Sequence, residues 1–224
     1  MLEEVKKENE FCNIDVFHDH GITGEGIVIW NTEEGNEHCE ITNARIETVA
    51  PSATIVNAGI YVHLKEGEIV ECHVDYEGRK YSLDEFVTEK KIKIMSRSKE
   101  GRLCSTKSLE KMYKELQEKH NLIIFNCAGN DGLDSAQYDD EVAILVGACV
   151  ERDGEIHRCS YSSVSGGVDF VDFVGVWAGT SFATPYLAGK SALLLELYGD
   201  MPQAQMYDLL KTLTNFREWN KELD

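Results

Sequence analysis

A serine among small residues, at the start of an apolar segment, is well placed in this chain for covalent chemistry. Residues 179–189 read Gly-Thr-Ser-Phe-Ala-Thr-Pro-Tyr-Leu-Ala-Gly, and the apolar character continues to residue 198. Because proline is tolerated in a first helical turn, Pro185 fits a buried helix that begins near Ser181. A helix N-terminus favours developing negative charge, so Ser181 could act as a nucleophile beside its own oxyanion donor. A Thr-Ser pair taken alone is more often an ordinary helix cap.

A second candidate segment follows an apolar run. Residues 122–125 read Leu-Ile-Ile-Phe, which is typical of a strand buried on both faces of a parallel sheet. Residues 126–132 continue as Asn-Cys-Ala-Gly-Asn-Asp-Gly and place Asn130 just beyond the strand. An Asn-Asp-Gly turn that closes a strand would explain Asn130 alone, without any chemistry.

These two segments together resemble the subtilisin-like serine peptidases, the subtilases. Residues 179–189 are similar to the family's nucleophile motif, Gly-Thr-Ser-Met-Ala-Thr-Pro-His-Val-Ala-Gly, and residues 123–132 are similar to its strand leading into Ala-Ala-Gly-Asn-Xaa-Gly. The resemblance implies that Ser181 is the nucleophile. It also implies that the Asn130 amide and the Ser181 backbone N–H hold the oxyanion.

The resemblance further implies a histidine general base early in the chain. Residues 46–55 are similar to the Val-Ala-Pro-Xaa-Ala segment that follows the family's catalytic histidine helix, which points to His38. Cys39 and Ile41 stand where the family has glycine and commonly histidine. The other histidines lack this context and are predicted to be surface or structural residues: His18, His20, His63, His73, His120 and His157.

At the position of the family's catalytic aspartate, this chain has an asparagine. Residues 24–33 resemble the family's strand that ends in the catalytic aspartate, which places Asn31 at the acid position and Glu33 at a usual glycine. An aspartate would orient the histidine and stabilise its imidazolium, whereas Asn31 brings no charge and would orient His38 imperfectly. Three explanations stay open: a slow or engineered enzyme, Glu33 or Glu34 as a substitute carboxylate, or lost catalysis.

Two segments are predicted to line the substrate cleft. Residues 93–96 resemble the strand that leads to the family's Ser-Leu-Gly, and an arginine here replaces the usual apolar residue. One hypothesis is that Arg97 accepts a substrate carboxylate; the alternative is an exposed edge arginine. The predicted substrate-binding residues are Ser96, Arg97, Ser98, Cys127, Ala128 and Gly129.

Strands and helices alternate along the chain. Apolar runs predict strands at residues 27–30, 54–63, 91–95, 122–125 and 142–150, with a surface hairpin at 66–81 and a helix at 105–120. This order predicts an α/β fold, which the resemblance specifies as a three-layer subtilisin-like architecture with a mostly parallel sheet sandwiched by helices. We expect one domain over residues 1–224, with a motif-bearing core at about 21–198, an irregular start over 1–20 and a helical tail over 199–224.

The composition excludes some classes of binding partner and favours others. Lysine plus arginine number 22 and aspartate plus glutamate 40, for a net charge of −18. Such a surface disfavours nucleic acid and anionic lipid and favours basic peptides. The 7 cysteines contain no Cys-Xaa-Xaa-Cys pair, and the N-terminal residues lack a signal-like apolar run. We therefore expect a cytoplasmic protein without cofactor or metal; the oligomeric state is left open.

The hypothesis that joins these observations is a serine endopeptidase. It would cleave a peptide or protein substrate through an acyl-enzyme on Ser181, slowly or not at all because Asn31 replaces the acid. The alternative is a catalytically inactive pseudopeptidase that acts as a peptide-binding or regulatory module.

Overall fold

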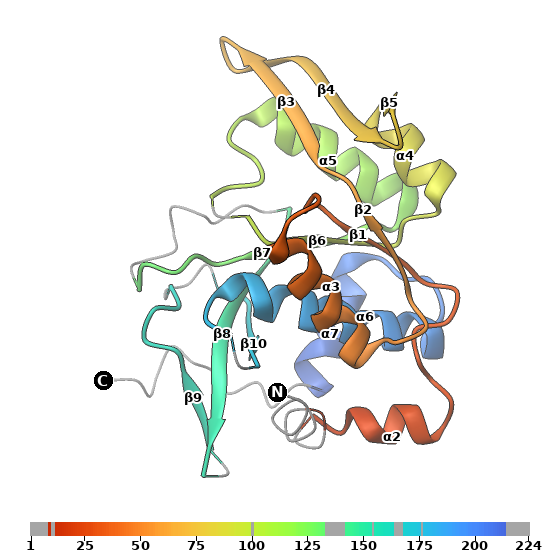
Figure 1. Ribbon diagram of the computed structural model, residues 1–224. Helices are drawn as coiled ribbons and strands as arrows, with labels where there is room; N and C mark the ends of the chain where they lie inside the picture. Colours follow the sequence, from red (N-terminus) through yellow and green to blue (C-terminus); the bar gives the residue numbers. More distant parts are fainter. Residues whose placement is uncertain are drawn as a thin grey trace.

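The computed structural model describes residues 9, 12–99, 101–132, 142–153, 155–163, 168–175 and 177–213 (Figure 1). The strands are β1 (Val28–Asn31), β2 (Thr54–Asn57), β3 (Ile60–Lys65), β4 (Glu68–Tyr76), β5 (Arg79–Tyr81), β6 (Ile94–Arg97), β7 (Ile123–Cys127), β8 (Ile144–Arg152), β9 (Glu155–Arg158) and β10 (Phe170–Phe173). The helices are α2 (Ile14–Asp19), α3 (Glu37–Val49), α4 (Leu83–Lys90), α5 (Lys107–His120), α6 (Thr180–Tyr198) and α7 (Gln203–Leu213).

A mainly parallel sheet forms the centre of the protein. Its strands lie in the order β10-β8-β7-β6-β1-β2, and β9 pairs with β8. Among the described strands of this sheet, the β8–β9 pair is antiparallel and the other pairs are parallel. The carboxyl ends of β1, β6 and β7 therefore meet at one edge, where Asn31 lies opposite Ser96. The candidate residues that follow these strands are brought together at this edge.

Helices cover both faces of the central sheet. α3, α6 and α7 pack on one face, while α4 and α5 pack on the other (Figure 1). Strand β1 is buried on both faces, because Ile29 enters the first of these cores and Trp30 enters the second. The Trp30 ring meets Phe86 of α4 edge to face, with ring centroids 5.0 Å apart. The predicted three-layer α/β architecture is confirmed.

A separate antiparallel sheet, β3-β4-β5, adjoins α4 and α5. The stretch 54–63, which we expected to be continuous, is divided between this sheet and the central one. The division falls at Ala58, whose N–H donates to the Asn31 carbonyl (3.1 Å) and whose carbonyl accepts from Trp30 Nε1 (2.7 Å). The predicted hairpin is present as β4 and β5, joined at the predicted turn Glu77-Gly78, where both residues have positive φ.

The N-terminal region departs from the sequence expectation. Residues 1–20 were expected to be irregular, yet their described part contains α2. Packing explains this helix: Ile14 is buried in the core, and His18 Nε2 contacts the Val49 carbonyl at 2.8 Å. Tertiary contacts, not local periodicity, stabilise so short a segment.

The C-terminal region contains a helix where a tail helix was predicted. α7 packs on α6 and buries Met206 and Leu210. The remainder of the predicted tail, residues 214–224, lies outside the described residues. None of the described helices is both long and apolar enough to cross a membrane.

Candidate active site

Ser181 occupies the second position of α6. Gly179 caps the helix with φ +141°, a conformation that suits glycine, and Ser181 itself is buried. A β-carbon at Gly179 would lie 3.1 Å from Ser181 Oγ, so the small residue also keeps space around the hydroxyl. The local sequence thus presents one hydroxyl at the positive end of a 19-residue helix.

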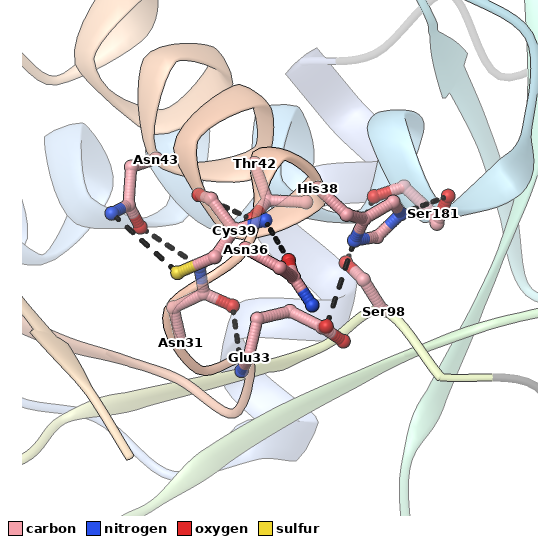
Figure 2. Close-up of polar contacts among 9 residues, drawn as sticks. All are labelled: Asn31, Glu33, Asn36, His38, Cys39, Thr42, Asn43, Ser98 and Ser181. Carbon is pink, nitrogen blue, oxygen red and sulfur yellow. Dashed lines mark hydrogen bonds and ion pairs between the residues drawn. The ribbon is translucent and has the colours of Figure 1, made fainter. Parts of the chain in front are cut away.

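His38 reaches this hydroxyl from the first turn of α3. Its Nε2 lies 3.0 Å from Ser181 Oγ, which is within hydrogen-bond distance (Figure 2). Asn36 starts the helix, because its side chain accepts a hydrogen bond from the Cys39 N–H at 2.8 Å. The Phe182 ring packs beside the imidazole, with centroids 5.1 Å apart. Capping and ring packing together hold the imidazole against the serine.

A carboxylate lies on the other side of the imidazole. Glu33 Oε2 is 3.6 Å from His38 Nδ1, and the Glu33 side chain is 8% exposed against 34% for His38. A carboxylate at Nδ1 favours the tautomer with the proton there, which leaves Nε2 able to accept a proton from Ser181. The second carboxylate oxygen, Oε1, is buried without a hydrogen-bond partner among the described residues.

Asn31 turns away from the imidazole. Its side-chain nitrogen donates to Thr42 Oγ1 and to Asn43 Oδ1, both at 2.8 Å, and its oxygen accepts from the Glu33 N–H at 3.3 Å. Figure 2 shows the amide directed at α3, while Glu33 extends toward His38. The described contacts therefore tie Asn31 to α3 and to the Glu33 backbone, whereas the sequence predicted contact with His38.

Asn130 lies beside the residue that precedes the serine. Its side-chain oxygen accepts from the Thr180 backbone N–H (2.7 Å) and from Thr180 Oγ1 (3.2 Å). These bonds fix the Asn130 side chain against the residue that precedes Ser181. Its role as an oxyanion donor stays a prediction.

A sequence comparison assigns the chain to a known family. The sequence model of the subtilase family, Peptidase_S8, matches residues 2–221. The chain belongs to the subtilase family. A comparison with curated proteins finds no significant match to the sequence.

Solved structures of subtilase-like proteases share the fold. A lanthipeptide protease superposes with a TM-score of 0.66 at 15% identity, covering 95% of this chain and 88% of that one. The prenylagaramide maturation protease PagA gives 0.61 at 16% identity, covering 88% and 87%. A cold-adapted subtilisin-like serine proteinase gives 0.61 at 16% identity, covering 85% and 82%.

In this subtilase, the two predicted cleft segments lie at the carboxyl ends of β6 and β7. Ser96 is fully buried, and its hydroxyl has no partner among the described residues. Ser98 donates its hydroxyl to the Ser181 carbonyl at 2.8 Å. Cys127 and Ala128 are fully buried, and the Gly129 N–H donates to Thr180 Oγ1 at 3.2 Å. The segments thus contact the serine loop, and their role in substrate binding stays a prediction.

The Arg97 guanidinium forms hydrogen bonds with other residues of the chain. Its Nη1 donates to the carbonyls of Lys99 (2.8 Å) and Gly101 (2.9 Å) and to Asn126 Oδ1 (2.7 Å). These bonds hold Lys99 and Gly101 against β7. They favour a structural role over the hypothesis that Arg97 accepts a substrate carboxylate.

Replacement of Arg97 tests that role. We expect Arg97→Gln to lower the free energy of unfolding by about 1–2 kcal/mol, because the bracing bonds to the Lys99 and Gly101 carbonyls are lost. Preference between acidic and neutral peptides should stay unchanged. Urea denaturation measures the free energy of unfolding, and cleavage of matched acidic and neutral peptides measures the preference. Lys99→Gln, at an exposed side chain, is the control. A selective loss of acidic peptides in Arg97→Gln would instead support the carboxylate subsite.

Cys39 does not compete with Ser181 as a nucleophile. Burial raises the pKa of the Cys39 thiol, so it stays protonated at neutral pH. Within the described parts of the chain, no group of three His, Cys, Asp or Glu side chains is arranged to hold a metal ion. The side chains that the structure brings into one line at this site are Glu33, His38 and Ser181.

Glu33 is the functional candidate that sequence comparison left unresolved. The family motif points to Asn31, and Glu33 stands at a position where the family has glycine. The available signal was spacing: His38 follows Asn31 by only seven positions, which made the carboxylates between them, among them Glu33 and Glu34, candidates for the partner of the imidazole.

Proposed function

We propose that this subtilase is a serine endopeptidase in which Glu33 replaces the missing aspartate. The observation that carries the proposal is the chain of contacts from Glu33 Oε2 through the His38 ring to Ser181 Oγ, at 3.6 and 3.0 Å. A nucleophile, a base and an orienting carboxylate in this order form the arrangement with which a serine triad performs acyl transfer.

The reaction follows from the roles of these groups. Ser181 Oγ attacks the substrate carbonyl while His38 Nε2 takes its proton, and the Glu33 carboxylate stabilises the resulting imidazolium. The Ser181 N–H and the Asn130 amide hold the oxyanion. His38 returns the proton to the leaving amine, and water then releases the acyl group by the same route.

A pseudopeptidase remains the second candidate. The observation in its favour is the His38–Glu33 separation of 3.6 Å, which exceeds an ordinary hydrogen bond. Together with the partly exposed imidazole, this separation fits a peptide-binding cleft with weak or no turnover. Activity measurements distinguish the two.

The proposed substrates are cationic peptides, cleaved selectively. The net charge of −18 supports attraction of basic chains at long range. Two structural neighbours carry the names lanthipeptide protease and prenylagaramide maturation protease, which supports peptide processing as the kind of reaction. The seven cysteines all lie within the described residues and none is in a disulfide, which supports a reducing compartment such as the cytoplasm.

A fluorophosphonate probe tests the proposed chemistry. Wild-type protein should be labelled covalently, and Ser181→Ala should not. A peptide library should then yield cleaved sequences enriched in lysine and arginine, with kcat/KM falling as salt is raised, because screening weakens long-range attraction. Absence of labelling in the folded wild type would favour the pseudopeptidase, and cleavage without any charge preference would contradict the substrate class.

A further inference from the structure

The helix that carries the nucleophile contains a proline at a specific distance from it. Pro185 lies four residues after Ser181 within α6. In an α-helix the N–H of residue i+4 donates to the carbonyl of residue i, and proline has no N–H to give. The proline ring also pushes against that carbonyl. The Ser181 carbonyl is therefore deprived of its regular helical donor.

A side chain from the central sheet supplies a donor instead. Ser98, directly after β6, gives its hydroxyl to the Ser181 carbonyl at 2.8 Å. Ser98 and Ser181 are both buried, so water does not readily replace this bond. Figure 2 shows Ser98 among the residues that surround the His38–Ser181 pair.

We propose that Ser98 is a positioning residue, which holds the Ser181 main chain in its reactive orientation by replacing the helix bond that Pro185 removes. The inference rests on the proposed peptidase function. On the N-terminal side of Ser181, the Thr180 N–H is fixed by Asn130 Oδ1 at 2.7 Å. On its C-terminal side, the Ser98 hydroxyl fixes the carbonyl. The nucleophile is thereby anchored to the ends of β7 and β6 and not only to its own helix.

This arrangement couples substrate binding to the nucleophile. Residues 96–98 form the segment predicted to line the cleft, and Ser98 ties this segment to Ser181 directly. A shift of the segment on substrate binding would act on the Ser181 main chain, which carries the hydroxyl. Small misplacements of a reacting group cost rate more than binding. The expected signature is a loss in kcat with KM preserved.

A cycle of variants tests the compensation between Ser98 and Pro185. Ser98→Ala should lower kcat and the rate of fluorophosphonate labelling about tenfold, with KM within about twofold. Pro185→Ala restores a helical N–H for the Ser181 carbonyl. The double variant Ser98→Ala/Pro185→Ala should therefore return to within about threefold of Pro185→Ala alone.

Two controls separate positioning from general stability. Ser191→Ala removes a buried hydroxyl of the same helix, which donates to the Leu187 carbonyl at 3.0 Å, and should leave kcat within about twofold. Ser98→Thr keeps a hydroxyl and should retain most of the labelling rate. Thermal melts report the folded fraction; if Ser98→Ala does not fold, Ser98→Cys, which keeps the volume but donates weakly, takes its place.

The outcomes also separate this inference from the proposed function. If wild type is labelled and Ser98→Ala is labelled at the same rate, Ser98 is not a positioning residue although the peptidase stands. If Ser98→Ala lowers kcat by the same factor in the wild-type and the Pro185→Ala backgrounds, Ser98 does not compensate for Pro185. If wild type is unreactive while folded, the peptidase proposal fails first.

Discussion

Glu33→Gln is expected to lower kcat for peptide hydrolysis by about 10²- to 10³-fold without unfolding the protein. The Glu33 carboxylate lies at His38 Nδ1, and in the proposed mechanism it stabilises the imidazolium that forms when Ser181 loses its proton. Glutamine has nearly the same shape and keeps an oxygen toward the ring, but it carries no charge. The loss should therefore appear in kcat and in the labelling rate, with little change in KM.

The expected size follows from the geometry. Removal of the acid from a serine peptidase triad lowers kcat by about 10⁴-fold. Here the carboxylate is 3.6 Å from Nδ1 and the imidazole is 34% exposed, so solvent screens part of the interaction. A somewhat smaller loss is expected for this reason.

Glu34→Gln decides between the two neighbouring carboxylates. Glu34 is exposed, and its Oε2 accepts from the Tyr61 hydroxyl at 3.1 Å, which directs it toward β3. Its replacement should change kcat by less than about threefold. If Glu34→Gln carries the large loss while Glu33→Gln does not, the assignment of the acid to Glu33 is wrong.

Ser181 and Asn130 illustrate what sequence can predict about such a site. Each lies in a contiguous motif whose strand-to-loop or loop-to-helix geometry is local, and the structure places both motifs around Thr180. The middle of the central sheet is predictable for a related reason. Strand β7 and the first part of β8 are continuous apolar runs, since both faces are buried. Strands β9 and β10 contain charged side chains and were not predicted.

The role of Glu33 could not be predicted from local sequence patterns. Which carboxylate meets His38 depends on the path of residues 32–36 and on the position of α3, and neither follows from residue type. The partner of Asn31 is likewise set by α3, whose Thr42 and Asn43 accept its amide. The division between β2 and β3 depends on contacts of Ala58 with β1. These contacts join residues that are far apart in the chain, so the local sequence does not reveal them.

Restoring the family's aspartate should destabilise this protein and leave it no more active. Asn31 is fully buried and uses its amide nitrogen as a donor to Thr42 Oγ1 and Asn43 Oδ1. An aspartate in its place would have no donor to offer and would bury a charge against oxygen atoms. We expect Asn31→Asp to lower the free energy of unfolding by about 2 kcal/mol, after partial relief by rotation of the neighbouring side chains. Urea denaturation at neutral pH measures this loss.

Asn36→Asp is the matched control for that change. It makes the same chemical substitution close by in the chain, but Asn36 is exposed and accepts from the Cys39 N–H at the start of α3. A carboxylate is favoured there by the cap and by the helix dipole, so stability should change by less than about 0.5 kcal/mol. Labelling of Ser181 in Asn31→Asp should stay within about twofold of wild type, because the new carboxylate faces α3 and Glu33 already occupies His38 Nδ1. A strong rise in labelling would instead mean that the aspartate reaches the imidazole, and Asn31 would then be the position at which this enzyme had been silenced.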